Sequence, residues 1–318
     1  LVTHKILPVL AVGTPVILNT SEKTPLSAIK LAELLFEAGL PDYMLSVLLG
    51  ATNEIAEPLV KDPRVAIVSF TGSVAVGKHI AAIAGYKKVI LELGGNDPLI
   101  IMEDADMEKA VFLASEGSFR NSGQRCTAVK RILVHEKIKD EFIKKFVEKA
   151  KEYSFGDPAD PETMVGTVID EAAASHLESV VKKSVAQGAK VILGGHRKGA
   201  LMEPTVIVDV PRNADMVVYE SFGPLAPIMS FKDIDDAIAL SNSTTYGLSS
   251  GVVTNNMEYA LKFVKELNVG TVNINEVPGY RIERSPFGGI KDSGLGVKEG
   301  VIEAMKCFTY VKTFSMPW

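Results

Sequence analysis

Short runs of apolar, mostly β-branched residues alternate along the chain with longer segments of helical periodicity. In the first part of the chain, the runs that read as strands are 15–19, 44–49, 65–70 and 87–93. A segment with helical periodicity follows each of them, at roughly 25–38, 53–61, 73–84 and 105–119. This alternation predicts βαβ crossovers and a mostly parallel sheet.

The same alternation resumes at residue 130 and continues almost to the end of the chain. Further strands are expected at 130–136, 190–195, 204–210, 227–231, 249–254 and 270–275. Further helices are expected at roughly 137–152, 170–187, 232–240 and 256–267. A change in composition at 94–101 predicts a boundary between two α/β domains. The alternating residues 308–316 predict an exposed terminal strand that pairs with another subunit.

Composition narrows the class of protein. The 318 residues are 47% hydrophobic, enough for a large core, and the dispersed net charge of −5 favours neither nucleic acid nor an anionic membrane as partner. The first residues carry a His, a Lys and a Pro, and no long apolar run follows, so we expect no signal peptide and no membrane span. Two cysteines favour a reducing compartment, here the cytoplasm. Because the chain starts at Leu1, we expect a fragment or a truncated frame.

Cys126 is the first candidate for chemistry. It lies in the Gly-rich and polar segment NSGQRCTAVK (121–130), with Arg125 beside it and Lys130 four residues on. Nearby cations lower the pKa of a thiol and make it a better nucleophile. The alternative is that Cys126 is a small buried hydrophobe. Cys307, in an apolar stretch, is expected in the core or at an interface.

Glu92 is the second candidate, at the end of an apolar strand in LELGG. Burial raises the pKa of a carboxyl group toward that of a useful general base, whereas a strand end facing solvent is the alternative. Together, Cys126 and Glu92 would supply the nucleophile and the base that oxidise an aldehyde through a thioester and then hydrolyse it.

Two segments suggest a dinucleotide. In SFTGSVAVGKHI (69–80) a strand ends at Gly72 and Ser73 and a helix carrying Gly77 follows, so the helix start could hold a pyrophosphate, or Ser73 could be only a helix cap. The segment lacks G-x-G-x-x-G. Glu22 follows a strand and could accept hydrogen bonds from a ribose diol, which favours NAD over NADP, or it could cap a helix before Thr24 and Pro25.

Six motifs occur in a fixed order along the chain: FTGS, LELGG, GQ-x-C, E-x-FGP, N-x-x-x-YGL and PFGG-x-K-x-SG. In this order they resemble the aldehyde dehydrogenase superfamily over essentially the whole chain. The resemblance implies an α/β fold with an incomplete Rossmann-like NAD domain at 1–94 and a catalytic α/β domain with a cysteine nucleophile at 95–305. It also implies a C-terminal bridging strand for oligomerisation at 306–318, in a homodimer or homotetramer.

The resemblance also implies roles for individual residues. Cys126 matches the nucleophile and Glu92 the base. The positions implied in cofactor binding, to NAD or NADP, are Glu22, Gly72, Ser73, Gly77, Leu93, Gly94, Glu220 and Phe222. Among these, Glu220 and Phe222 match the pair that positions the nicotinamide ribose and ring. No metal is implied.

Two departures from the family pattern matter. Asn19 stands where the family most often has a lysine near the adenosine ribose, which leaves NAD versus NADP open. Leu1 falls just after the family's oxyanion segment, so the oxyanion asparagine, the first strand of the cofactor sheet and part of the bridging arm are absent from the sequence. The loss of one oxyanion donor typically costs about 10² to 10³ in rate.

At finer level, stretches such as NSGQRCTAVKRILV are similar to phosphonoacetaldehyde dehydrogenases. Arg125, Lys130 and Arg281 would then contact an anionic tail on a small aldehyde. Alternatively, Arg281 pairs with Glu276 or Glu283, and Lys130 caps a strand.

Three other functions remain open at this point. The first is a sibling dehydrogenase for lactaldehyde, a semialdehyde or a phosphorylated glyceraldehyde. The second is an inactive NAD-binding remnant. The third is a cysteine hydrolase, which would need His135 or His176 beside the thiol.

Overall fold

The structure is a computed structural model that describes residues 1–297 and 299–318. These residues form two compact units: unit 1 comprises Leu1–Leu93, Ile282–Gly288 and Gly294–Trp318, and unit 2 comprises Gly94–Arg281 and Gly289–Ser293. The first division falls between Leu93 and Gly94, at the start of the predicted boundary. Most of the chain after Arg281 returns to unit 1, whereas the sequence placed it with the second domain.

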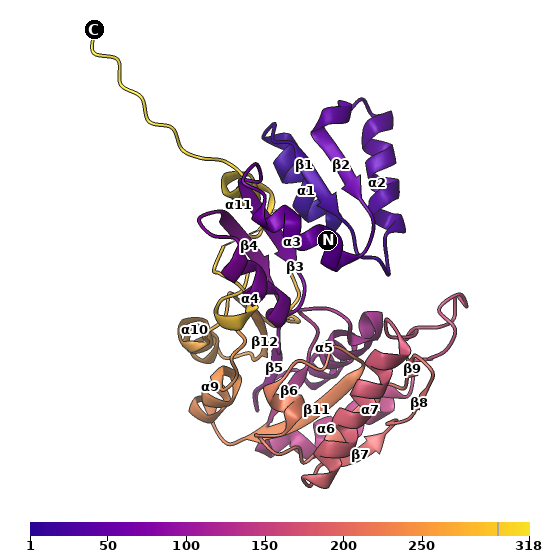
Figure 1. Cartoon of the computed structure of the whole chain (residues 1–318). Coiled ribbons are helices and arrows are strands. Elements are labelled where there is room, and N and C mark those ends of the chain that lie inside the picture. Colours follow the sequence, from indigo (N-terminus) through magenta and orange to yellow (C-terminus); the bar gives the residue numbers. More distant parts are fainter. Residues whose placement is uncertain (298) are drawn as a thin grey trace. The chain divides into compact units, whose positions relative to one another are not determined.

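Unit 1 contains two separate pairs of parallel strands, each formed across a helical crossover (Figure 1). Its strands are β1 (Val16–Asn19), β2 (Leu45–Leu48), β3 (Ile67–Thr71) and β4 (Lys88–Glu92). Its helices are α1 (Val2–Ala11), α2 (Leu26–Glu37), α3 (Thr52–Lys61), α4 (Val74–Ile83) and α11 (Val301–Cys307). Ile6, Ala32 and Leu45 form one small core beside β1 and β2, and Ile80, Leu91 and others form a second beside β3 and β4.

Unit 2 is built on a seven-stranded sheet with the order β13-β12-β5-β6-β11-β10-β7. All neighbours are parallel except β7, which runs antiparallel to β10. The strands are β5 (Pro98–Ile101), β6 (Arg131–His135), β7 (Lys190–Leu193), β10 (Thr205–Val208), β11 (Leu225–Phe231), β12 (Ser249–Val253) and β13 (Thr271–Ile274). A short antiparallel pair, β8 (Arg197–Lys198) and β9 (Leu201–Met202), lies outside this sheet.

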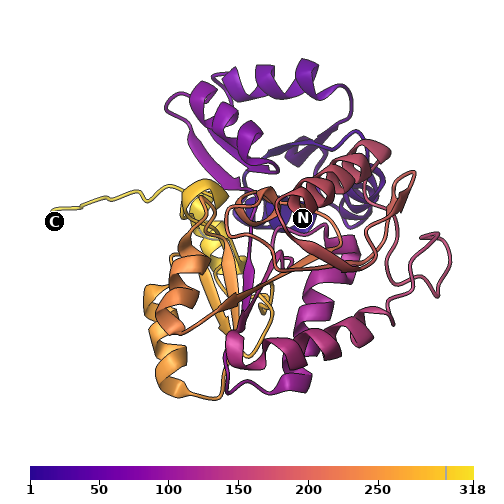
Figure 2. The ribbon, with the colours of Figure 1, turned by 90° about the horizontal axis from the view of Figure 1, so that it is seen from below.

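Helices cover both faces of the unit 2 sheet (Figures 1 and 2). They are α5 (Met107–Phe119), α6 (Lys139–Ala150), α7 (Glu171–Ala186), α8 (Asp215–Val218), α9 (Ile234–Asn242) and α10 (Met257–Glu266). Alternate residues of the central strands divide between the two cores: Leu99 and Ile132 pack with α5 and α6, while Ile100 and Leu133 pack with α7, α9 and α10. Burial on both faces is what an apolar parallel strand requires.

The predicted α/β class and most of the alternating elements are confirmed. The sequence analysis missed β5, a four-residue strand that starts at Pro98, the helices α1 and α11, and the short elements β8, β9 and α8. Residues 308–318, expected as a terminal strand, form no strand ladder within the described chain and run extended and exposed beyond α11 (Figure 1). Pairing of this segment with another subunit stays a prediction.

Among the described residues, no helix is both long and apolar enough to cross a membrane.

Candidate active site

The loop that carries Cys126 follows α5 and turns sharply. Asn121 and Ser122 have φ angles of 56° and 54°, and Gly123 has a φ of 69°. A Cβ atom at residue 123 would lie 2.1 Å from the carbonyl oxygen of Gly223, so only glycine permits this contact. The loop therefore rests directly on the main chain of the ESFGP segment, residues 220–224.

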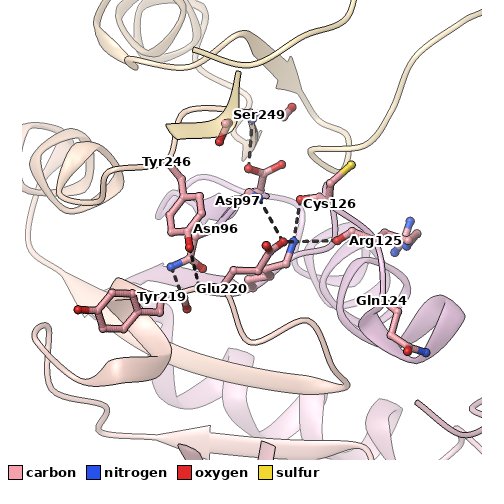
Figure 3. A network of polar contacts seen from close by, with 12 residues as sticks. Asn96, Asp97, Gln124, Arg125, Cys126, Tyr219, Glu220, Tyr246 and Ser249 are labelled. Atoms are coloured by element: carbon pink, nitrogen blue, oxygen red, sulfur yellow. Dashed lines mark hydrogen bonds and ion pairs between the residues drawn. The ribbon is translucent and has the colours of Figure 1, made fainter. Parts of the chain in front are cut away.

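Cys126 itself is half-buried. Its side chain points away from the polar network beneath the loop, and its carbonyl oxygen points into that network (Figure 3). The turn is closed by a hydrogen bond of 3.1 Å from Ala128 N–H to the Arg125 carbonyl. The other cysteine, Cys307, lies on α11, where burial raises the pKa of its thiol.

Lys130 lies at the centre of the polar network and is 2% exposed. Its Nζ donates to the carbonyl oxygens of Arg125 at 2.8 Å and Cys126 at 2.7 Å. The same atom forms an ion pair of 3.1 Å with Oε1 of Glu220. An ammonium has three N–H donors, so these contacts account for all of them. The expected contact between Lys130 and an anionic substrate tail has no support in this geometry.

Glu220 is held against the glycine pair that follows β4. Its Oε1 accepts a hydrogen bond of 3.1 Å from Gly95 N–H. A Cβ atom at Gly94 would lie 2.2 Å from Oε2, and one at Gly95 would lie 2.6 Å from the Cys126 carbonyl oxygen. The two glycines therefore allow the Glu220 carboxylate and the Cys126 loop to approach the main chain closely. Glu220 also lines a cavity of about 110 Å³ whose other lining residues are His176, Val180, Lys183, Asp215, Met216, Tyr219 and Ser221.

Asp97, which the sequence analysis did not select, belongs to the same network (Figure 3). Its Oδ1 accepts a hydrogen bond of 3.1 Å from Ser249 N–H, and its carbonyl oxygen accepts one of 3.0 Å from Lys130 N–H. Burial raises the pKa of Asp97 to about 8. The sequence signal was an acid directly before the apolar run 98–101, whereas Glu92 had been selected as an acid at the end of an apolar strand.

The other candidate residues of unit 2 are Arg125, Phe222 and Arg281, and they differ in burial and in contacts. Nη2 of Arg125 donates to the carbonyl oxygens of Glu116 at 3.1 Å and Gly117 at 3.0 Å, and burial lowers the pKa of this guanidinium. Phe222 has a φ of 55°, and its ring centroid lies 5.9 Å from Nζ of Lys130, in cation–π range. Arg281 is half-buried at the end of the main span of unit 2.

In unit 1, Glu92 is the last residue of β4 and is 5% exposed. Its carbonyl oxygen accepts a hydrogen bond of 3.1 Å from Gly72 N–H, and an isolated bridge links it to Gly294. A Cβ atom at Gly288 would lie 2.8 Å from Oε1 of Glu92. The PFGG segment therefore approaches the carboxyl group closely, in the buried setting that the sequence predicted. The role of Glu92 as a base stays a prediction.

The expected cofactor residues of unit 1 lie at the carboxyl ends of its strands. Ser73 caps α4, and its Oγ accepts a hydrogen bond of 3.4 Å from Val76 N–H. A Cβ atom at Gly77 would lie 2.4 Å from the side chain of Leu93, so α4 packs closely on the end of β4. A third glycine serves the same close helix–strand packing in nucleotide-binding turns. At Gly72, a Cβ atom would lie 2.4 Å from the Phe70 ring.

Glu22 makes a helix contact other than the one expected. Its Oε1 accepts a hydrogen bond of 2.5 Å from Thr52 N–H at the start of α3, and this bond lowers the pKa of Glu22. The helix that it contacts is α3, whereas the sequence had offered the helix that follows Thr24 and Pro25. The binding of a ribose by Glu22 stays a prediction.

The structure thus gathers Gly94, Cys126, Lys130, Glu220 and Phe222 within unit 2. Glu22, Gly72, Ser73, Gly77, Glu92 and Leu93 belong to unit 1. The pairing of Glu92 with Cys126 joins the two units and stays a prediction. Among the described residues, no group of three or more His, Cys, Asp and Glu side chains could hold a metal ion.

Unit 2 therefore holds a half-buried thiol on a glycine-dependent loop, and unit 1 holds a turn of the kind that binds nucleotides. A family model described as "Aldehyde dehydrogenase family" matches residues 1–314, and the chain belongs to that family. The resemblance that the six motifs indicated is confirmed at this level.

Curated relatives carry several substrate names. The chain is 43% identical to the 3-sulfolactaldehyde dehydrogenase of Priestia aryabhattai over 94% of its own length and 63% of that protein's length. It is 38% identical to the sulfoacetaldehyde dehydrogenase of Neptuniibacter caesariensis, covering 98% of this chain and 68% of the relative. The chain therefore spans somewhat less than two thirds of the first of these relatives.

Solved structures agree with the fold. A glyceraldehyde-3-phosphate dehydrogenase of Methanocaldococcus jannaschii complexed with NADP superposes with a TM-score of 0.94 at 40% identity, covering 97% of this chain and 68% of that one. Aldehyde dehydrogenase 21 of Physcomitrella patens, in complex with the reaction product succinate, has a TM-score of 0.93 at 40% identity, covering 97% and 64%.

Proposed function

We propose that the protein oxidises an aldehyde to a carboxylate with NAD⁺ or NADP⁺, using Cys126 as nucleophile and Glu92 as base. The observation that carries this proposal is the Cys126 loop. Its main chain is fixed by Gly123 against Gly223 and by Lys130, while its thiol points away from the network that holds it (Figure 3). A rigid backbone with a half-buried thiol is what a positioned nucleophile requires.

The chain's own residues account for the covalent steps. The Cys126 thiolate adds to the aldehyde carbon and forms a C–S bond, and the backbone N–H of Cys126 stabilises the resulting oxyanion. The carbonyl re-forms as the hydrogen leaves with its electron pair, which gives a thioester on Cys126. Glu92 then takes a proton from water, the hydroxide adds to the thioester, and the C–S bond breaks to release the carboxylic acid and the thiolate. The acid then loses its proton to solvent and leaves as the carboxylate.

When bound, a nicotinamide dinucleotide supplies the hydride acceptor. The turn between β3 and α4 fits such a ligand, because Gly77 lets α4 pack on Leu93 and the helix start presents backbone N–H groups beside Ser73. Glu220 and Phe222 are proposed to hold the nicotinamide ribose and ring, and Glu22 the adenosine ribose. Asn19 leaves both NAD and NADP as candidates.

For the substrate, we propose a short aldehyde with an anionic tail, phosphonoacetaldehyde being the sequence-based candidate. Names among the relatives, 3-sulfolactaldehyde and sulfoacetaldehyde dehydrogenases, point to small aldehydes that carry a sulfonate. Lactaldehyde, named for several other relatives, is the uncharged alternative. Of the three cations expected near the substrate, Lys130 and Arg125 donate to main-chain carbonyls. We propose Arg281 as the contact for the anionic tail, on the sequence resemblance alone.

We also propose a homodimer or homotetramer in the cytoplasm. The C-terminal segment 306–318 is proposed to pair with a second copy through residues 308–318, which run extended beyond α11, because an extended strand with open hydrogen-bonding groups readily adds to a sheet edge. Among the described residues no disulfide joins Cys126 and Cys307, and both thiols fit a reducing compartment.

The test is to incubate the full chain with NAD⁺ or NADP⁺ and a matched set of aldehydes: phosphonoacetaldehyde, sulfoacetaldehyde, lactaldehyde and propanal. We expect reduced cofactor to form, faster with the two anionic aldehydes than with propanal. Replacement of Arg281 by Ala should remove that preference. Equal rates for charged and uncharged aldehydes would overturn the substrate class, and reduced cofactor that still forms after Cys126→Ser would overturn the mechanism.

A second candidate is dinucleotide binding without turnover. It is favoured by the turn between β3 and α4, whose fit to a dinucleotide does not depend on the chemistry at Cys126. It predicts that the chain binds NAD⁺ in calorimetry but forms no reduced cofactor from any aldehyde in the set.

A further inference from the structure

The covalent steps proposed above give no role to the buried ammonium of Lys130. Lys130 is 2% exposed, and a buried charge is retained only where other groups fully compensate it. Its partners come from two segments that are far apart in sequence. Two are main-chain carbonyls of the loop that carries the thiol, Arg125 and Cys126, and the third is the side chain of Glu220.

The contacts close into a ring. Oε1 of Glu220 also accepts the N–H of Gly95 at 3.1 Å, and a Cβ atom at Gly95 would lie 2.6 Å from the Cys126 carbonyl oxygen. The Gly95 peptide, the Cys126 carbonyl, the Lys130 ammonium and the Glu220 carboxylate therefore contact one another in turn. A displacement of Glu220 must be transmitted to the nucleophile's own peptide unit, or the ring must open.

Glu220 is also accessible from the other side. It lines the cavity of about 110 Å³ between α7, α8 and the ESFGP segment, and Lys130 does not. A ligand that reaches Glu220 from this cavity would thus contact Lys130 only through the carboxylate. Nζ of Lys130 contacts the Glu220 carboxylate and the Cys126 carbonyl, and Lys130 does not line the cavity. Its position is that of a residue that supports these two groups and does not contact the ligand.

We infer that Lys130 is a positioning residue that couples the Glu220 carboxylate to the backbone of Cys126. This inference rests on the proposed function, in which Glu220 holds the nicotinamide ribose and Cys126 is the nucleophile. It replaces the substrate contact that the sequence suggested for Lys130. When the ammonium is removed, Glu220 loses its fixed position and the Cys126 carbonyl loses its donor, so cofactor affinity and thiol reactivity change together.

The experiment is a double-mutant cycle in the Cys307→Ser background, which leaves Cys126 as the one thiol to follow. The variants are Lys130→Met, Glu220→Gln and the two combined. Each is measured for its dissociation constant for NAD⁺ and NADP⁺ and for the rate at which iodoacetamide alkylates Cys126. Lys145→Met is the matched control, because Lys145 pairs with Glu108 at 2.6 Å on the exposed surface.

We expect Lys130→Met to change the alkylation rate and to weaken dinucleotide binding on the order of tenfold, the size of coupling seen between contacting residues. In the Glu220→Gln background the same substitution should weaken dinucleotide binding little further, because the carboxylate that Lys130 positions is already altered, and its effect on the alkylation rate should be smaller than in the parent. Lys145→Met should leave both readouts unchanged.

Two results would overturn the inference. One is that the single effects simply multiply in the combined variant. The other is that Lys130→Met lowers the melting temperature while both readouts stay as in the parent, which is the outcome for a purely structural lysine. If Lys130→Met alone does not fold, the combined variant, which removes both charges, is compared with Glu220→Gln, and a markedly weaker affinity of the combined variant for the dinucleotide would count against the inference.

The measurements distinguish failure of the proposed function from failure of this inference. If the parent forms no reduced cofactor from any aldehyde, the proposed reaction fails, whereas the alkylation rates still decide whether Lys130 and Glu220 act as one unit on Cys126.

Discussion

Gly123 and Gly223 touch main chain to main chain: a Cβ atom added to Gly123 would lie 2.1 Å from the Gly223 carbonyl oxygen. The loop that carries Cys126 and the segment that carries Glu220 are therefore held at a fixed separation by two residues without side chains. Neither residue takes part in the chemistry, yet the geometry of the thiol depends on both.

Gly123→Ala should destabilise unit 2 more than a positive φ alone explains. Gly199→Ala is the matched control, because Gly199 has a φ of 57°, close to the 69° of Gly123, with no atom within 4 Å of an added Cβ. The control should cost about 1–2 kcal/mol from backbone strain, and Gly123→Ala a further ~1–3 kcal/mol from overpacking. Urea unfolding measures both, and equal losses would show that the contact with Gly223 is unimportant.

Cys126→Ser should abolish formation of reduced cofactor, because a serine hydroxyl without an adjacent base is a far weaker nucleophile than a thiolate. Cys307→Ser should retain it, since Cys307 lies on α11 of unit 1. Circular dichroism of both variants checks that the fold is unchanged. Comparable activity in the two variants would remove Cys126 from the mechanism.

Glu92→Gln should permit one rapid burst of reduced cofactor followed by a stall, because the thioester forms but no base activates the water. Stopped-flow fluorescence gives the burst, and mass spectrometry of the quenched protein gives the acyl adduct on Cys126. Glu37→Gln, at the exposed end of α2, is the control and should turn over as the parent does. A steady rate without a burst in Glu92→Gln would mean that another group supplies the base.

Asp97 should make the stability of the protein fall as pH rises. Burial raises its pKa from 3.8 to about 8, so across that interval the folded carboxyl keeps a proton that the unfolded chain has released. The contribution of protonated Asp97 is fully present below pH 3.8 and is lost as pH rises toward 8.

Asp97→Asn isolates this contribution, because an amide oxygen can still accept the hydrogen bond from Ser249 N–H. Denaturant unfolding at several pH values gives the difference in unfolding free energy between variant and parent. That difference should shift in favour of Asp97→Asn between pH 4 and 8 and then level off. A constant difference across the range would show that Asp97 titrates normally.

Periodicity predicted most of the elements because strands and helices in this chain bury regular faces. It missed β5, since Pro98 opens a strand of only four residues directly after two glycines and two polar residues. The alternation over 308–316 suggested a strand, but strand formation requires a partner, and within the described residues this segment pairs with no other strand.

The site was partly predictable for a similar reason. Gly94 and Gly95 indicated a close approach, and the structure brings Glu220 and the Cys126 carbonyl there. Lys130 was assigned to the substrate mouth because a lysine in a polar turn is usually exposed. Its burial depends on Glu220, which lies 90 residues further along the chain, and local sequence carries no signal of such a pairing.

The strands of unit 1 pair only in twos among the described residues, whereas unit 2 has a seven-stranded sheet. Two-stranded sheets are marginal without further support, and small cores resist local unfolding less than large ones. Backbone amides of β1 to β4 should thus exchange with deuterium well before those of β5, β6 and β11. Unit 1, which we propose to bind the pyrophosphate and the adenosine ribose, should therefore open locally before unit 2 does. A bound dinucleotide should slow the exchange of its amides.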